Sequence, residues 1–199
     1  MGSYKLSVII PAYNAEETIK RAIESIPRRE DIQTIVVDDG STDKTYEVAS
    51  TFPYVLVVKS KKNKGVAAAV NTGLSLATGE YVVLLGSDDD FYTQALETAM
   101  EQLDGTDLVY FDLRINDGMI MYLRPDTKET YCGSTKFMRR EFVGDLREPE
   151  DKKAGEDWVF YQELLKKNPT EKFTNIVAKH YNFPREGSLS WQMRNGLIK

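Results

Sequence analysis

Three consecutive carboxylates, Asp88, Asp89 and Asp90, stand directly behind an apolar run in the segment LLGSDDDFY. Like charges this close together repel one another, and the end of a buried strand makes the repulsion worse. One explanation is the start of a helix, where Asp is favoured by capping and by the helix dipole, with Asp90 as the N-cap. The other explanation is a divalent cation that lies between these carboxylates and a phosphate group.

The elements around these acids alternate between strand and helix. Apolar and β-branched runs predict strands at residues 5–10, 33–37, 54–58 and 81–85. Helical spacing of apolar residues predicts helices that begin near residues 14, 44 and 66, and a fourth helix over residues 96–103. This alternation indicates βαβ crossovers and an α/β fold, with a single, Rossmann-like, mainly parallel sheet covered by helices on both faces.

The pattern changes after Leu103, so a single domain is expected to have a regular α/β half, residues 1–103, and a mixed α+β half, residues 104–199. An Asn-Asp-Gly turn at 116–118 between two apolar runs predicts a hairpin. Further elements are expected in the second half as a helix at 135–142, a charged loop at 143–155, a helix at 156–167 and a strand at 173–181.

The bulk composition excludes several function classes. The chain has 199 residues with a formal net charge of −5, which argues against a protein held to nucleic acid by a basic surface. No apolar run approaches the roughly 18 residues that span a bilayer. The single cysteine, Cys132, suggests a reducing compartment, and no signal peptide is evident, so a cytoplasmic location is expected.

The loops after the four predicted strands read PAYNAE, DDGSTD, SKKNKG and GSDDD. The carboxyl ends of parallel strands meet at one edge of a sheet, so the acids of the second and fourth loops are expected to converge there. Oxygen ligands without nearby Cys or His favour Mg²⁺ or Mn²⁺. Neither G-x-G-x-x-G nor a Walker A sequence is present, so a metal-bound nucleoside diphosphate is the simplest ligand.

Four segments in this order resemble family 2 glycosyltransferases of the GT-A fold: SVIIPAYNAEETIKRAIES, IVVDDGSTDKT, NKGVAAAVNTGLSLATGEYVVLLGSDDD and AGEDW. The resemblance runs from about residue 5 to residue 158, with a weaker echo in YNFPREGSLS. It implies inverting transfer of a sugar from a nucleotide-sugar, with Mn²⁺ or Mg²⁺, to the hydroxyl of a glycan or glycoconjugate. It also implies that residues 1–103 are the nucleotide-binding half and residues 104–199 the acceptor-side half of one GT-A domain.

The same resemblance implies roles for individual residues. Asp39 accepts a hydrogen bond from the base, as in uridine-binding members, which favours a UDP-sugar donor. Asp88 and Asp89 ligate the metal. Asp157 is the general base, and Glu156 positions the acceptor. The implied nucleotide contacts are Pro11, Ala12, Tyr13, Asn14, Asp39, Asn63, Gly65 and Asp88.

The sequence departs from the family pattern at three positions. Gly86 stands where members often carry Asp, Val70 where they often carry Arg, and Arg185 where many carry a His that helps to bind metal. Three alternatives stay open beside the leading hypothesis: a GT-A module that binds nucleotide or sugar without catalysis, a transferase that uses a polyprenyl phosphate acceptor, and a nucleotidyltransferase.

Overall fold

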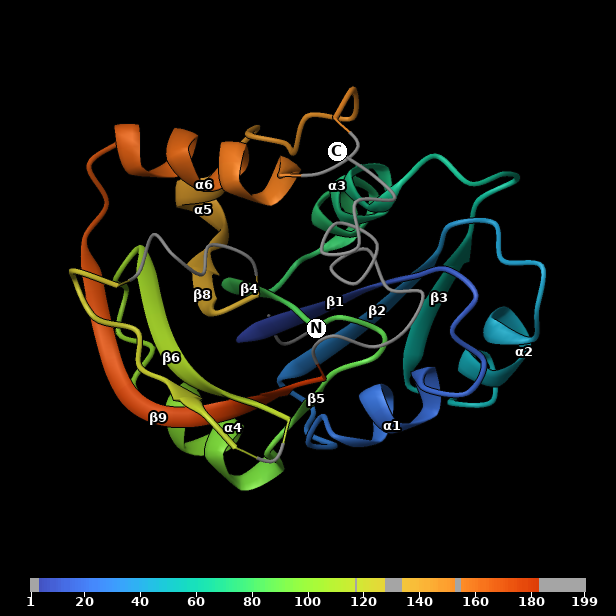
Figure 1. Cartoon of the computed structure of the whole chain (residues 1–199), viewed down its shortest axis with the longest axis horizontal. Helices are drawn as coiled ribbons and strands as arrows, with labels where there is room; N and C mark the ends of the chain where they lie inside the picture. Colours follow the sequence, from blue (N-terminus) through green and yellow to red (C-terminus); the bar gives the residue numbers. More distant parts are fainter. Residues whose placement is uncertain (1–3, 117, 128–133, 153–154, 183–199) are drawn as a thin grey trace.

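The computed structural model describes residues 4–116, 118–127, 134–152 and 155–182. Its strands and helices alternate through the first half of the chain and become irregular in the second (Figure 1). In chain order they are β1 (Leu6–Ala12), α1 (Ile19–Glu24), β2 (Ile32–Asp38), α2 (Thr45–Ala49), β3 (Val55–Lys59), α3 (Val66–Leu76), β4 (Tyr81–Leu84), β5 (Asp90–Phe91), α4 (Thr93–Met100), β6 (Leu108–Ile115), β7 (Ile120–Met121), β8 (Lys136–Arg139), α5 (Arg140–Val143), α6 (Glu156–Lys166) and β9 (Glu171–Tyr181).

One sheet joins both halves of the chain, in the order β3-β2-β1-β4-β8-β6-β9-β5, with β7 paired to β6. The strands β3, β2, β1 and β4 are parallel, whereas β8 is antiparallel to both β4 and β6. Because β8 lies between β4 and β6 and is antiparallel to both, β6 runs parallel to β4. The carboxyl ends of the parallel strands β1, β2, β3 and β4 share one edge of the sheet.

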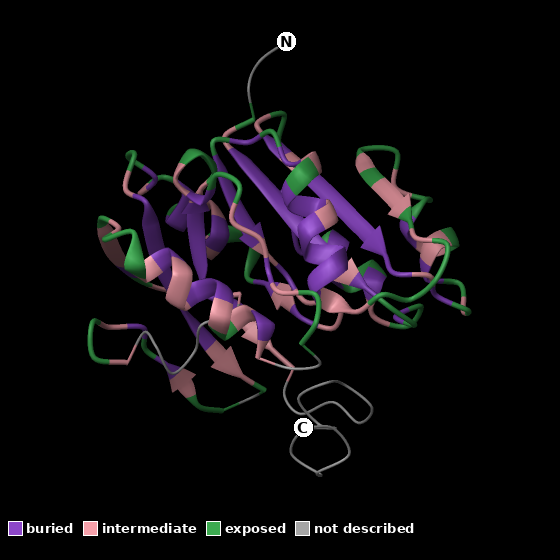
Figure 2. Ribbon diagram, turned by 90° about the horizontal axis from the view of Figure 1, so that it is seen from above, coloured by how far each residue is buried: buried purple, intermediate pink, exposed green. Residues whose placement is uncertain are grey.

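Helices cover both faces of this sheet (Figure 1). Ile19 of α1, Ala49 of α2 and Leu96 of α4 belong to the core on one face. Val70 of α3 and Phe160 of α6 belong to the core on the other face. The central strands are buried along almost their whole length (Figure 2), as expected where apolar runs face a helix layer on both sides.

The structure confirms the predicted α/β fold, the hairpin of β6 and β7, and the helix that begins at Glu156. The helix predicted at 135–142 is wrong, because residues 136–139 form β8 and only α5 follows. Phe137 and Met138 are both buried but face opposite cores, as neighbours on a strand do. The prediction of Asp90 as an N-cap is also wrong: it begins β5, where Arg21 Nε lies 3.1 Å from its Oδ1.

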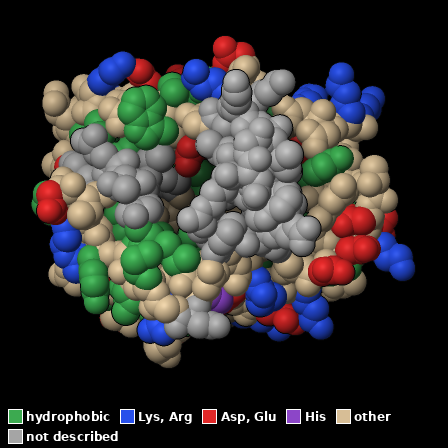
Figure 3. Space-filling view, in the orientation of Figure 1, with side chains coloured by type: hydrophobic (Ala, Val, Ile, Leu, Met, Phe, Trp, Pro, Cys, Tyr) green, Lys and Arg blue, Asp and Glu red, His purple; other side chains and the backbone are tan. Residues whose placement is uncertain are grey.

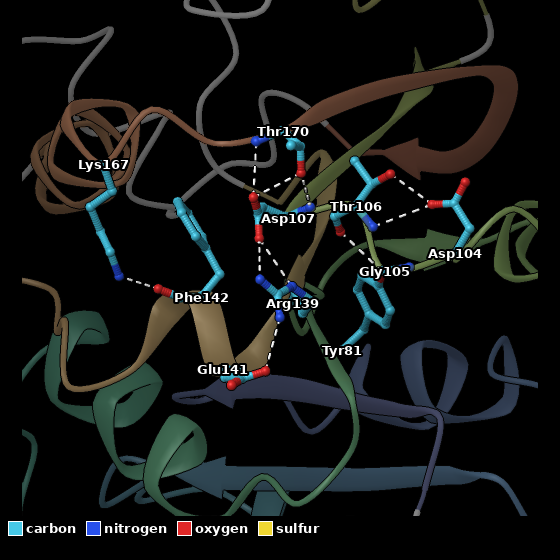
Figure 4. Close-up of polar contacts among 10 residues, drawn as sticks. All are labelled: Tyr81, Asp104, Gly105, Thr106, Asp107, Arg139, Glu141, Phe142, Lys167 and Thr170. Atoms are coloured by element: carbon cyan, nitrogen blue, oxygen red, sulfur yellow. Dashed lines mark hydrogen bonds and ion pairs between the residues drawn. The ribbon is translucent and has the colours of Figure 1, made fainter.

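A polar network ties the second half together at the edge opposite the aspartate loops (Figure 4). Asp107, just before β6, accepts hydrogen bonds from Arg139 Nη2 at 2.6 Å and from the Thr170 backbone N–H at 2.9 Å. Burial works to raise the pKa of Asp107, but the hydrogen bonds from Thr170 and Arg139 outweigh it and hold the pKa below its ordinary value. The network therefore joins the starts of β6 and β9 to the end of β8.

Two features of the surface bear on partners. On the face shown in Figure 3, Lys and Arg side chains lie around the rim with acidic side chains between them, so the described residues form no continuous basic surface in this view. Within the described ranges, none of the helices is both long enough and apolar enough to pass through a bilayer.

Candidate functional site

The ends of β1 and β2 are linked by backbone hydrogen bonds at the edge where acids were predicted to converge. The Asp39 N–H donates to the Ala12 carbonyl at 2.8 Å, and the Ser60 N–H donates to the Asp38 carbonyl at 2.8 Å. Asp38 shapes the turn after β2, because its Oδ1 accepts the Ser41 N–H at 2.8 Å and its Oδ2 lies 3.5 Å from Lys59 Nζ. The neighbouring carboxylate, Asp39, makes different contacts.

Asp39 is only 3% exposed, and its two oxygens have different surroundings. Oδ2 accepts the backbone N–H groups of Lys64 and Gly65 at 2.9 and 2.7 Å, just before α3. Oδ1 is buried and has no hydrogen-bond partner among the described residues. A buried acceptor without a partner is costly, so this oxygen is available to a ligand that donates a hydrogen bond.

The predicted nucleotide residues Pro11, Ala12, Tyr13 and Asn14 lie at the end of β1, beside the loop that follows β2. The Asn14 N–H donates to Ser41 Oγ at 2.9 Å, and Asn14 Oδ1 accepts the Thr42 N–H at 3.0 Å. Asn14 thus shapes the loop through its side chain, and its contact with nucleotide stays a prediction. Tyr13 is 46% exposed, which leaves its ring available for stacking.

The predicted contacts Asn63 and Gly65 lie in the loop that holds Asp39. Asn63 Oδ1 accepts the Gly65 N–H at 3.0 Å. Gly65 has φ +96°, a left-handed conformation that favours glycine, and a Cβ added there would meet nothing within 4 Å. The structure therefore brings the ends of β1, β2 and β3 together around the unpartnered oxygen of Asp39, with open space beside Gly65.

The aspartate segment is held by residues near the end of the described chain. Asp89 Oδ2 lies 2.8 Å from Lys179 Nζ, and its Oδ1 accepts the Asn182 N–H at 3.0 Å. Both side chains of the Asp89–Lys179 pair are almost fully buried. Burial works to raise the pKa of Asp89, and the Lys179 ammonium opposes this. The ion pair with Lys179 explains how the Asp89 carboxylate is tolerated at this buried position.

Asp88 and Asp89 differ in what they offer to a metal ion. Both oxygens of Asp89 already have protein partners. The Asp88 side chain is half-buried, and its backbone carbonyl accepts Asn182 Nδ2 at 2.7 Å. No group of three metal-ligating side chains was found in the described part of the chain. A cation held by one carboxylate and by phosphate oxygens fits Asp88, as is usual for Mg²⁺. The predicted role of Asp89 as a metal ligand requires the Lys179 ammonium to move away from Asp89 Oδ2, and it stays a prediction.

Gly86 explains one departure from the expected motif. A Cβ added at Gly86 would lie 2.8 Å from Asp89 Oδ2 and 3.1 Å from Asp88 Oδ1. The first distance is shorter than real Cβ contacts allow, and Lys179 fixes the oxygen that would have to move. A larger residue at position 86 therefore requires the Asp89 carboxylate to shift from its place beside Lys179. Arg185 and Cys132 lie outside the described residues.

The predicted acceptor-side acids begin α6. Gly155 precedes them with φ +74°, a conformation that a side chain rarely adopts. Asp157 is half-buried, and its Oδ1 accepts the Trp158 N–H at 2.8 Å. Glu156 is 9% exposed, and burial together with the charge of Asp157 raises its pKa. Trp158 is 51% exposed beside them.

Sequence reasoning missed three residues that support this site: Lys179, Asn71 and Glu148. Asn71 is a buried amide among the apolar residues of α3, and that contrast was a usable signal. Its Nδ2 donates to the Glu148 carbonyl at 2.9 Å, and its Oδ1 accepts the Glu148 N–H at 2.8 Å. Because Gly65 caps α3 and Asn71 lies within it, one helix connects the Asp39 loop with the segment that leads to α6.

Comparison with known proteins indicates the same family as the sequence motifs do. The family model described as Glycosyl transferase family 2 matches residues 7–153. The minor teichoic acid biosynthesis protein GgaB of Bacillus subtilis is 28% identical over 96% of this chain, which corresponds to 24% of GgaB. The Escherichia coli protein named UDP-Glc:alpha-D-GlcNAc-diphosphoundecaprenol beta-1,3-glucosyltransferase WfaP is 28% identical over 98% of this chain and 83% of its own length.

Solved structures share the fold. Residues 1–349 of Staphylococcus aureus TarS, in complex with UDP-GlcNAc, align with a TM-score of 0.83 and 24% identity over 94% of this chain and 60% of that one. The mannosyltransferase PcManGT of Pyrobaculum calidifontis, in complex with GDP-Man and Mn²⁺, aligns with a TM-score of 0.72 and 25% identity over 98% of this chain and 61% of that one. The chain thus spans about a quarter of GgaB and less than two thirds of either solved chain.

Proposed function

Because this chain belongs to glycosyltransferase family 2, we propose that it transfers a sugar from a UDP-sugar to a hydroxyl group by single displacement with inversion. The observation that carries the donor assignment is the buried Oδ1 of Asp39, which no residue of the described ranges hydrogen-bonds. Uracil offers one ring N–H at its Watson–Crick edge, and a carboxylate oxygen held by two backbone N–H groups is a suitable acceptor for it. Tyr13 supplies the stacking surface, and Pro11 and Ala12 line the pocket.

Asp39→Asn is expected to weaken UDP binding by more than about 10-fold, as a lost buried hydrogen bond does. The two backbone N–H groups of Lys64 and Gly65 require an oxygen at Oδ2, so the amide NH₂ would replace Oδ1 and face the uracil N–H, donor against donor. Isothermal titration calorimetry with UDP measures the change. Asp104→Asn, which replaces an acid remote from this edge, is the matched control, and equal affinities for the two variants would contradict the assignment.

The proposed cofactor is Mn²⁺ or Mg²⁺, held by Asp88 and by the diphosphate, with Asp89 as the further predicted ligand. When bound, the cation offsets the negative charge on the departing diphosphate. The chain's own contribution is to fix the backbone of Asp88: Arg21 Nη2 donates to the Asp88 carbonyl at 2.5 Å, and Asn182 donates to the same oxygen.

The chemical step assigns the base to Asp157. The acceptor oxygen attacks the anomeric carbon from the face opposite the diphosphate, so the new C–O bond forms as the bond to the phosphate oxygen breaks. The hydroxyl proton passes to the Asp157 carboxylate, as general base catalysis requires. Glu156, buried beside it, positions the acceptor.

We propose a glycan or glycoconjugate as the acceptor. The support is the names of two relatives: WfaP is named for a lipid-diphosphate-linked sugar acceptor, and GgaB for teichoic acid biosynthesis. The cytoplasmic location also stays a prediction.

Thermal unfolding with nucleoside diphosphates tests the donor and the metal together. UDP with Mn²⁺ or Mg²⁺ at about 100 times the dissociation constant is expected to add roughly 2.7 kcal/mol, a shift of several degrees in Tm. EDTA is expected to reduce the shift, because the diphosphate then lacks its cation beside Asp88. A shift with GDP alone would overturn the UDP assignment. No shift with any nucleotide would favour a binding module without donor-dependent catalysis.

A further inference from the structure

Glu148 is a buried acid that the proposed chemistry does not use. It lies in the connection between α5 and α6, and only 4% of its surface is exposed. Its Oε2 has no hydrogen-bond partner among the described residues. An ionised carboxylate is rarely stable under such conditions, because burial removes its hydration and no hydrogen bond replaces it.

The backbone of Glu148 is fixed even though its carboxyl group is unsatisfied. The Asn71 side chain of α3 donates to its carbonyl and accepts from its N–H, as described above. Asn71 Nδ2 also donates to Glu150 Oε1 at 3.0 Å. This clamp fixes the Glu148 backbone against α3, so a charge on its carboxyl group reaches water only after the side chain or the segment moves.

The charged groups that act on Glu148 come from three parts of the fold. Glu156 and Asp157 belong to α6, Lys136 belongs to β8, and Glu150 shares the Asn71 clamp. Lys136 is itself buried, with its ammonium 4.4 Å from the centre of the Tyr161 ring. Burial, and next the charges of Glu156 and Asp157, raise the pKa of Glu148 to about 8, with Lys136 acting in the opposite direction.

We propose that Glu148 is a positioning residue of the transfer reaction, held as a neutral acid behind Glu156 and Asp157, and that its ionisation withdraws these two acids from the acceptor. The inference rests on the proposed function of Asp157 as the base. Oε2 of Glu148 and Oε2 of Glu156 are both buried without hydrogen-bond partners among the described residues, so a third negative charge in this cluster gains no hydrogen bond at these atoms, and Lys136 is the cation that opposes it.

The consequence of ionisation follows from the charges that face Glu148. A charged Glu148 carboxylate repels Glu156 and Asp157, which begin α6. This repulsion displaces the two acids from the acceptor, and transfer slows without any change in the donor pocket around Asp39.

The first experiment measures transfer between pH 6 and 9.5, with each protein's profile normalised to its own maximum. Wild-type activity is expected to fall at high pH with a midpoint near 8. Glu148→Gln, which mimics the protonated acid at every pH, is expected to remove this alkaline decline. Lys136→Met removes the opposing cation and is expected to move the midpoint upward by roughly half to one pH unit. An alkaline decline that is the same in all three proteins would overturn the proposal.

The second experiment needs no substrate and separates this proposal from the proposed function. A carboxyl group whose folded pKa is raised contributes stability below its unfolded pKa, and that contribution is lost as pH rises toward the folded value. The Tm of wild type is therefore expected to fall relative to that of Glu148→Gln between pH 5 and 8. Parallel Tm curves would refute a neutral Glu148, even if transfer itself were demonstrated. If Glu148→Gln does not fold, the Lys136→Met midpoint decides alone.

Discussion

Asp157→Asn is expected to lower kcat for sugar transfer by roughly 10²- to 10⁴-fold while UDP binding stays unchanged. The amide cannot accept the proton that the acceptor hydroxyl must lose. The substitution otherwise preserves the site, because the amide oxygen can accept the Trp158 N–H as Asp157 Oδ1 does, at 2.8 Å. Initial rates with a UDP-sugar and calorimetry with UDP separate loss of the base from loss of donor binding.

The matched control is Glu163→Gln on the same helix. Glu163 pairs with Lys166 on the surface, 2.6 Å between Nζ and Oε1, and such pairs contribute little. Its turnover is expected to equal that of wild type. If Asp157→Asn also keeps wild-type turnover, the base is a different group, and Glu156 is the next carboxylate to test.

The regular first half of the fold could be predicted because its central strands β1, β2 and β4 are mostly buried on both faces. Runs such as YVVL in β4 are then apolar without interruption, and a helix directly follows each of the first three strands. The strand β8 could not be recognised in the same way. Its Phe137 and Met138 are adjacent in sequence and enter different cores, so four residues show neither a helical period nor an alternation.

The candidate site was predictable to the level of loops but not of atoms. In the DD pair at the end of β2, Asp38 shapes a turn and Asp39 has an oxygen available to a ligand. The sequence does not distinguish these two roles, because they depend on the path of the backbone through the loop. The surroundings of Asp89 were hidden for another reason. Its partner Lys179 lies 90 residues away, and β9 reaches it by pairing with β5 at the far end of the sheet order.

Lys179→Met is expected to lower the free energy of unfolding by about 3–5 kcal/mol, because it leaves Asp89 as a buried charge without its cation. The Lys179 ammonium holds the pKa of Asp89 down, so its removal raises that pKa further. A carboxyl group with a raised folded pKa loses stability as pH rises, and the deficit of the variant is therefore expected to shrink toward pH 4. Urea unfolding at several pH values measures both effects.

A double-mutant cycle with Asp89→Asn shows whether the two side chains act as a unit. The double variant contains no uncompensated charge, so it is expected to be more stable than the sum of the single losses predicts, by about 1–3 kcal/mol. Additive losses would contradict the pairing. Lys166→Met breaks the exposed Glu163 pair instead and is expected to cost less than about 1 kcal/mol. If Asp89 is also a metal ligand, Mn²⁺ is expected to recover stability in Lys179→Met and not in the double variant, because only the former presents a carboxylate freed from its lysine.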